Sequence, residues 1–193
     1  VLPYEVFSPT DLGRLPAPSA GDLFFDFEGD PMWAEPGSDV WGLEYLWGFV
    51  DVENGTEEPR FTALWAHDRA EERQALRDFL GHVVELRGRY PGMHVYHYSP
   101  YETAALKRLS VRYGECEQEL DDLLRAGVFV DLYPAVKAAV RVGSPSYSIK
   151  KLEPLYMGDQ LRESDVADGA GSIAAYVEYR EMRAADPAGA AHR

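Results

Sequence analysis

Acidic and aromatic residues alternate near the start of this sequence, in the stretch GDLFFDFEGDP at residues 21–31. Because side chains alternate between the two faces of a β-strand, Asp26 and Glu28 project from the same face, with Cα atoms about 6–7 Å apart. Asp is uncommon in strands and neighbouring like charges repel, so the pattern calls for a compensating partner. Carboxylate oxygens are the ligands that Mg²⁺ and Mn²⁺ prefer. Two such ions about 3.5–4 Å apart would act on the attacking and leaving oxygens of a phosphodiester.

The same stretch also fits an ordinary strand whose solvated face is acidic, and the spacing alone does not separate the two interpretations. Asp30 would share the face of Asp26 and Glu28 if the strand continued. Gly29 and Pro31 predict a turn, however, so we expect Asp30 at the rim of the site.

A second acid follows the fourth predicted strand. Ser99 and Pro100 predict a helix start, which places Glu102 in the first helical turn. There it either points across the sheet toward Asp26 or is simply favoured by the helix dipole. His97 and Tyr98 would flank the same rim, and a histidine in such a place is more commonly a packing or hydrogen-bonding residue than a ligand.

One further acid and several cations complete the candidates. Asp131 closes the predicted strand VFVDL and is either a supporting acid or the cap of the next helix. The 33 acidic residues outnumber the 19 basic ones, for a net charge of −14, so contact with nucleic acid must be local or aided by metal ions. A soluble acidic domain without a nucleic-acid role is the alternative. The candidates for phosphate contact are Arg108, Arg112, Arg141, Lys150 and Lys151.

The elements that must position these residues follow from hydrophobic periodicity and turn signals. Strands are predicted at residues 23–28, 43–52, 61–66, 93–98 and 128–132, and helices at 67–90, 99–113, 116–127, 133–140, 146–158 and 172–183. The turn signal Glu53-Asn54-Gly55 predicts that the first three strands are antiparallel neighbours. The order indicates an α/β fold with a mixed five-stranded sheet flanked by helices.

Composition and length bound the remaining possibilities. The first twenty residues contain four prolines and predict a linker or extended arm, and residues 21–193 form one domain. No stretch approaches the roughly 20 apolar residues of a membrane span, and no secretory leader opens the chain. The single cysteine, Cys116, favours a reducing compartment, and we expect a cytoplasmic protein.

Three segments in order resemble a known family: FFDFEGD, HVYHYSPYETAALKRL and VFVDLYPAVKAAVRVGSPSYSIKKLEPLYMG. They are similar to the DEDD-type 3′–5′ exonucleases of the RNase H-like superfamily, and more narrowly to the RNase H-like domain of RecB-like putative nucleases. The resemblance covers residues 15–183. It implies an RNase H-like fold and a nuclease that uses two Mg²⁺ or Mn²⁺ ions on DNA, at a single strand or 3′ end, with RNA not excluded. It also implies a role in DNA repair and neighbouring nuclease and helicase domains in a longer chain.

The resemblance also implies roles for individual residues. Asp26 would bridge two metal ions, Glu28 would bind the metal on the nucleophile side, and Glu102 would be the second acid, a Glu where most of the wider superfamily has Asp. Asp131 matches a supporting position.

The fourth acid of the family, in an H-x-x-x-D or Y-x-x-x-D setting, has no match. Arg180 and Arg183 follow four residues after Tyr176 and Tyr179, and the loop at 163–171 lacks the preceding aromatic residue or histidine. We therefore expect the sequence to stop before the last catalytic helix, and these residues alone to be weakly active or inactive. The alternative is a catalytically degenerate module that binds nucleic acid or a partner domain.

Overall fold

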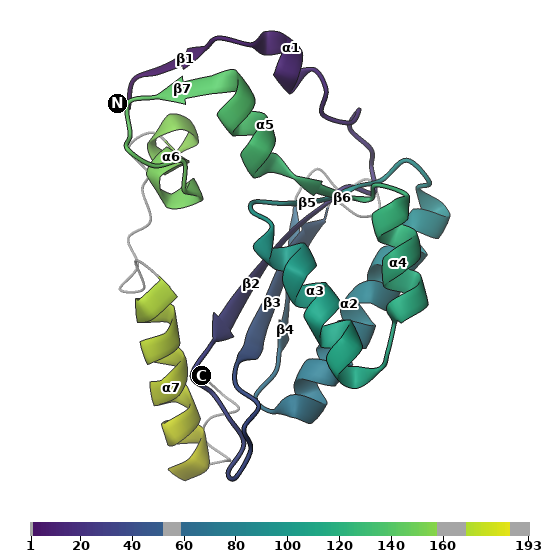
Figure 1. Ribbon diagram of the computed structural model, residues 1–193, viewed down its shortest axis with the longest axis vertical. Coiled ribbons are helices and arrows are strands. Elements are labelled where there is room, and N and C mark those ends of the chain that lie inside the picture. The colour runs from purple at the N-terminus through teal and green to yellow at the C-terminus, as the bar shows by residue number, and fades with distance from the viewer. Residues whose placement is uncertain (1, 52–58, 158–168, 186–193) are drawn as a thin grey trace.

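A mixed five-stranded sheet forms the centre of the chain, described by a computed structural model over residues 2–51, 59–157 and 169–185 (Figure 1). The strands lie in the order β4-β3-β2-β5-β6. The first three in sequence are antiparallel, whereas β5 pairs in parallel with both β2 and β6. Their bounds are β2 Leu23–Asp30, β3 Leu43–Asp51, β4 Arg60–Trp65, β5 Val95–His97 and β6 Phe129–Asp131. The predicted α/β class and mixed five-stranded sheet are confirmed.

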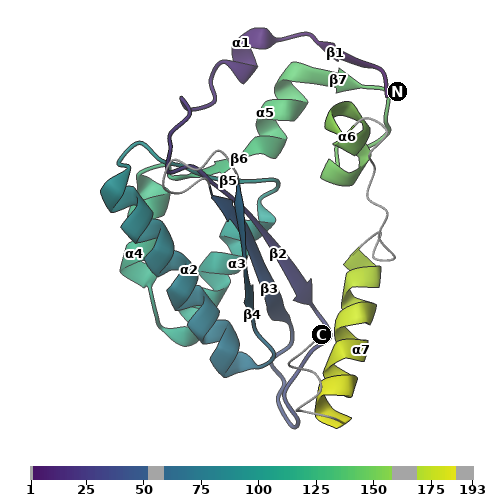
Figure 2. The same cartoon turned by 180° about the vertical axis from the view of Figure 1, so that it is seen from behind.

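Helices cover the sheet unequally. The helices of the described residues are α1 Pro9–Leu12, α2 Arg69–Arg89, α3 Tyr101–Tyr113, α4 Glu117–Arg125, α5 Leu132–Ala139, α6 Ile149–Tyr156 and α7 Gly169–Ala185. Figures 1 and 2 show α2, α3 and α4 on one side of the sheet and α7 beside β2 on the other. None of these helices is long and apolar enough to cross a membrane.

The start of the chain is joined to the region after α5. β1 (Tyr4–Val6) pairs antiparallel with β7 (Val140–Val142), and α1 packs on α5. Residues 133–140 are predicted as helix, but α5 ends at Ala139 and Val140 already lies in the strand. Three residues are too few for a period-two pattern, so the sequence does not predict β7. The predicted turn at 53–55 lies outside the described residues, although the strands that flank it pair as expected.

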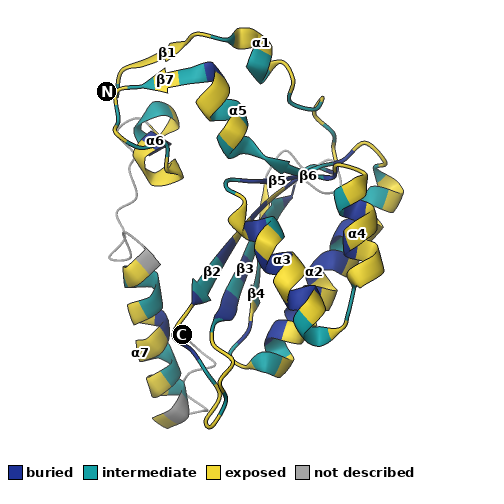
Figure 3. Cartoon of the chain, viewed as in Figure 1, coloured by how far each residue is buried: buried dark blue, intermediate teal, exposed yellow. Residues whose placement is uncertain are grey.

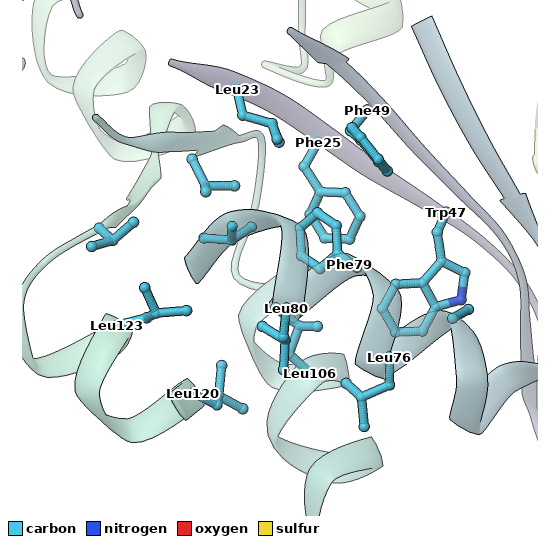
Figure 4. Packing of buried hydrophobic residues seen from close by; sticks show 14 of the residues in the cluster. Leu23, Phe25, Trp47, Phe49, Leu76, Phe79, Leu80, Leu106, Leu120 and Leu123 are labelled. Carbon is cyan, nitrogen blue, oxygen red and sulfur yellow. The ribbon is translucent and has the colours of Figure 1, made fainter. Parts of the chain in front are cut away.

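The main core lies between the sheet and α2, α3 and α4. Phe25 of β2 stacks on Phe79 of α2 with ring centroids 4.0 Å apart (Figure 4). Phe27 packs edge-on against Trp47 of β3. The helical stripe predicted for α2 supplies buried side chains, Phe79 among them. Each buried residue of this size contributes about 1.5–3 kcal/mol, so this packing fixes β2 firmly in the sheet. In Figure 3 buried residues run through the sheet and α2–α4, whereas β1 and α5 are mostly exposed or intermediate.

Strand β2 divides its side chains between a covered and an open face. Leu23, Phe25 and Phe27 are at most 6% exposed, whereas Phe24 between them is 51% exposed. The turn predicted at Gly29 is wrong, because β2 runs on to Asp30, which is buried rather than at a rim. The pairing continues because the register with β3 shifts by one residue between Glu28 and Gly29, a β-bulge.

Candidate active site

The predicted acids meet where β5 ends and β2 continues. The last pair between these parallel strands is Phe24 with Tyr96, so Asp26 lies two residues beyond it on β2. The chain turns after β5 and starts α3, which brings the buried Glu102 into the space beside Asp26. On its other side Asp26 pairs with Gly48 of β3, where the Phe61 ring lies so close that a Cβ atom would meet it at 3.3 Å.

Glu102 is held by two residues of the loop before α3. The Ser99 hydroxyl donates to Glu102 Oε2 at 3.2 Å, and His97 Nδ1 lies 3.4 Å from the same oxygen. His97 Nδ1 also donates to the Ser99 carbonyl at 2.7 Å. Burial lowers the pKa of His97, but the hydrogen bonds to Glu102 and to the Ser99 carbonyl, and the nearby carboxylates, outweigh it and raise the pKa overall. The His97 imidazole therefore stands behind the Glu102 carboxylate, and these contacts favour its protonated form.

Asp26 and Glu102 are close enough to interact directly, as the placement of Glu102 at a helix start predicts. The pKa of Asp26 is raised to about 6, first by desolvation and then by the charge of Glu102, with smaller contributions from Glu28 and from a hydrogen bond to Glu102. The Phe27 amide donates to Asp26 Oδ1 at 2.9 Å and opposes the shift. Asp26 remains exposed as a residue, so its desolvation comes from crowding around the carboxyl rather than from full burial. Like charges crowd at this point.

The loop before α3 has an unusual backbone. Ser99 has φ 141°, which side chains other than glycine rarely adopt and which costs about 1–3 kcal/mol. Its amide donates to Asp131 Oδ1 at 3.0 Å, and the same carboxylate caps α5 through the Tyr133 amide at 2.9 Å. Asp131 therefore caps α5 and also supports the loop that carries Ser99. The helix predicted to start at Ser99 starts two residues later: Pro100 is the N-cap and α3 begins at Tyr101.

A cavity of about 390 Å³ opens on the face of the sheet away from α2 and α3. Asp26 and Glu28 line it together with apolar side chains, among them Phe24 and Phe61. Phe24 stacks on Tyr96 with ring centroids 5.4 Å apart. The two predicted ligands of β2 thus face an aromatic hollow.

Tyr98 also lines this cavity, but its hydroxyl is engaged. It donates to the carbonyl of Tyr147, and burial together with nearby phenols and carboxylates raises its pKa to about 12. Tyr98 therefore positions the wall of the cavity rather than serving as a base.

The predicted cations fall into two groups. Arg108, Arg112 and Arg141 pair with Glu44, Glu72 and Glu5 respectively, away from the cavity. Lys150 and Lys151 are exposed in the first turn of α6, next to Ile149, which lines the cavity. Of the predicted cations, Lys150 and Lys151 are therefore the two that follow a residue of the cavity wall.

The donor set suits a hard divalent cation. Asp26, Glu28 and Glu102 offer only carboxylate oxygens, and the raised pKa of Asp26 records a repulsion that a cation would relieve. As they stand, no three His, Cys, Asp or Glu side chains of the described residues are arranged to hold a metal ion. The chemistry of the ligands fits, and their coordination would require side-chain adjustment.

Comparison with known proteins gives one match. The model of the RNase H superfamily matches residues 23–188, which include Asp26, Glu28, Glu102 and Asp131. No curated protein and no solved structure matches the chain.

Proposed function

This chain belongs to the RNase H superfamily, and from that premise we propose that it is a metal-dependent nuclease domain that hydrolyses phosphodiester bonds of DNA. The observation that carries the proposal is the meeting of the Asp26 and Glu102 carboxyls near Glu28, where β2 continues past the end of β5. Such a cluster of like charges costs stability, and proteins keep arrangements of this kind mainly at functional sites. The resemblance described above favours a 3′–5′ exonuclease that acts on single strands or 3′ ends, within a longer RecB-like nuclease and helicase protein.

The metal ligands in this proposal are Asp26, Glu28 and Glu102. When bound, two Mg²⁺ or Mn²⁺ ions would supply neutralising charge for the attacking and leaving oxygens of the phosphodiester. Asp26 is the ligand best placed to serve both ions, because it lies between the other two acids and interacts with each.

The remaining residues orient this set. His97 and Ser99 fix the rotamer of Glu102, and Asp131 holds the Ser99 amide, so the second acid is aimed by three contacts. The aromatic hollow beside Asp26 would receive the nucleotide, and Lys150 and Lys151 would contact phosphates that lead to it.

A non-catalytic RNase H-fold module that binds nucleic acid or a partner domain is the second candidate. Two observations favour it. Tyr176 and Tyr179 of α7 are followed four residues later by Arg180 and Arg183, where the resemblance implies an acid. The described residues also contain no ready-made metal cluster.

The test measures cleavage and binding with the same oligonucleotides. Because residues 1–193 alone are expected to be weakly active or inactive, the test uses the longer protein proposed above. Single-stranded and duplex DNA and RNA, labelled at either end, are incubated with that protein and Mn²⁺ or Mg²⁺. We expect shortening of DNA from its 3′ end, and Asp26→Asn should reduce the rate by about 100-fold or more, at least the loss typical of an outer-shell partner. Asp39→Asn, an exposed acid of the β2–β3 loop, is the matched control and should keep the rate.

Each outcome decides between the candidates. DNA binding by fluorescence anisotropy without cleavage in either metal would support the non-catalytic module. Cleavage that survives Asp26→Asn, or equal loss in Asp39→Asn, would remove Asp26 from the proposed site.

A further inference from the structure

A buried acid of β3, Glu44, lies directly beneath the proposed site. It is 3% exposed, and both of its carboxylate oxygens accept from the Tyr101 hydroxyl, at 2.9 and 3.0 Å. The Arg108 guanidinium pairs with the same carboxylate. Neither Glu44 nor Tyr101 is among the residues predicted for the site, although an acid inside the apolar strand LEYLWGF is the same kind of signal as Asp26.

Gly29 shows how closely Glu44 approaches β2. A Cβ atom at Gly29 would overlap the Glu44 carboxylate and come within 3.2 Å of the Tyr101 hydroxyl. Gly29, which follows Glu28 in β2, pairs with Glu44 of β3 directly after the bulge. A side chain at position 29 would therefore displace the Glu44 carboxylate, whereas glycine lets that carboxylate lie against the strand that carries Glu28.

Tyr101 connects this support to the second acid. It is the first residue of α3 and the chain neighbour of Glu102. Its ring packs edge-on against Phe27, which lies between Asp26 and Glu28, at a centroid distance of 6.4 Å. The Glu44–Tyr101 contact thus joins the strand that carries Asp26 and Glu28 to the helix start that carries Glu102.

We propose that Glu44 is a positioning residue, which through Tyr101 and Arg108 fixes the spacing between Glu28 on β2 and Glu102 on α3. The inference deepens the proposed function and rests on it, since the spacing matters only if these acids bind metal together. Partners that orient metal ligands typically change metal affinity by 10-fold to 100-fold when they are removed, as a rough guide. Glu44 itself does not line the cavity.

A matched control comes from a second buried acid whose tyrosine partner, like Tyr101, lies on α3. Glu72 of α2 is 0% exposed and accepts from the hydroxyl of Tyr113, the last residue of α3. Tyr101→Phe and Tyr113→Phe therefore each remove one phenol hydroxyl from a buried carboxylate, at opposite ends of α3. Only the first lies next to Glu102.

The first measurement is Mn²⁺ affinity by calorimetry. Tyr101→Phe should weaken binding roughly 10-fold or more. Tyr113→Phe leaves the hydrogen bond from the Glu44 amide to Glu72 in place and should change the affinity by no more than about 2-fold. Glu44→Gln, which keeps the acceptor for Tyr101, should retain more affinity than Tyr101→Phe. Equal weakening by Tyr101→Phe and Tyr113→Phe would reduce Glu44 to a general structural role and overturn the proposal.

The second measurement is hydrogen exchange in the metal-free protein, which does not depend on nuclease function. Tyr101→Phe should accelerate exchange roughly 10-fold at residues 104–106 and at Gly29 and Asp30 together, as expected for the loss of a hydrogen bond to a charged group. Unchanged exchange at either segment would overturn the proposal. If the wild type binds no Mn²⁺, the proposed function fails, and exchange in both segments still decides whether Glu44 couples them.

Discussion

Replacing Asp26 by Asn should stabilise the metal-free protein above pH 6. The pKa of Asp26 rises from its usual 3.8 to about 6 in the folded chain, because the carboxyl is desolvated and lies beside Glu102. In the unfolded chain the carboxyl titrates near its usual value. The folded state therefore pays an ionisation penalty above pH 6 that Asn, a neutral isostere, does not carry.

The size and pH window follow from this shift. One pKa unit corresponds to about 1.4 kcal/mol, so the full shift corresponds to at most roughly 3 kcal/mol. Because Asp26 is exposed, water screens part of the penalty, and we expect a gain of about 1 kcal/mol. Below pH 3.8 the carboxyl is protonated in both states and the gain vanishes. It grows between pH 3.8 and 6 and is complete above pH 6.

Urea unfolding at pH 8 and pH 4, followed by circular dichroism with EDTA present, measures this gain. Asn can still accept from the Phe27 amide, so the substitution changes charge with little change in hydrogen bonding. Asp39→Asn is the control and should be neutral at both pH values. Added Mn²⁺ should stabilise the wild type more than Asp26→Asn, because a ligand stabilises only the state that binds it.

A loss of stability at pH 8 would refute the crowding of carboxyls at this site. The same conclusion would follow from a gain of equal size at pH 4, because a gain that ignores pH does not arise from ionisation.

Two further substitutions test the supports of the site. Asp131→Ala should lower the free energy of unfolding by about 1–2 kcal/mol in urea titrations, because it removes the α5 cap and the Ser99 contact, whereas Asp131→Asn should lose less. Tyr176→Ala should cost about 3–5 kcal/mol in the same titrations, because this buried ring stacks on Tyr45 at 3.8 Å and holds α7 to the sheet. Tyr179→Ala, on a partly exposed ring, should cost less, and equal losses would contradict the docking of α7 through Tyr176.

Strong periodic signals made the central fold predictable. The alternating residues of β2 and the helically spaced apolar residues of α2 each form one face that packs into the main core. Local sequence and tertiary packing therefore agree here. β1 and β7 were not predictable, because each has only three residues and their pairing joins segments over 130 residues apart. Such contacts depend on tertiary arrangement, which periodicity does not encode.

The candidate site was predictable only in part. The proximity of Asp26 and Glu102 was predictable, because a helix that starts directly after a strand places its first residues at the edge of the sheet. The continuation of β2 to Asp30 was not, because it depends on a bulge in the partner strand. That bulge also pairs Glu44 with Gly29, so the support beneath the site follows from a register shift for which the sequence carries no local signal.

The contrast between two acidic clusters is the strongest argument for function. Glu44 and Glu72 are buried, and each is matched by arginine and tyrosine donors, as a structural cluster requires. In the described part of the chain, the Asp26 carboxylate instead accepts from an amide and interacts with another acid, and no arginine or lysine is among the groups that shift its pKa. The fold supplies arginines to Glu44 and Glu72 but leaves Asp26 and Glu102 to repel, and this difference supports the proposal that a cation from outside the chain binds them. A divalent cation and the phosphate that it binds would complete that balance.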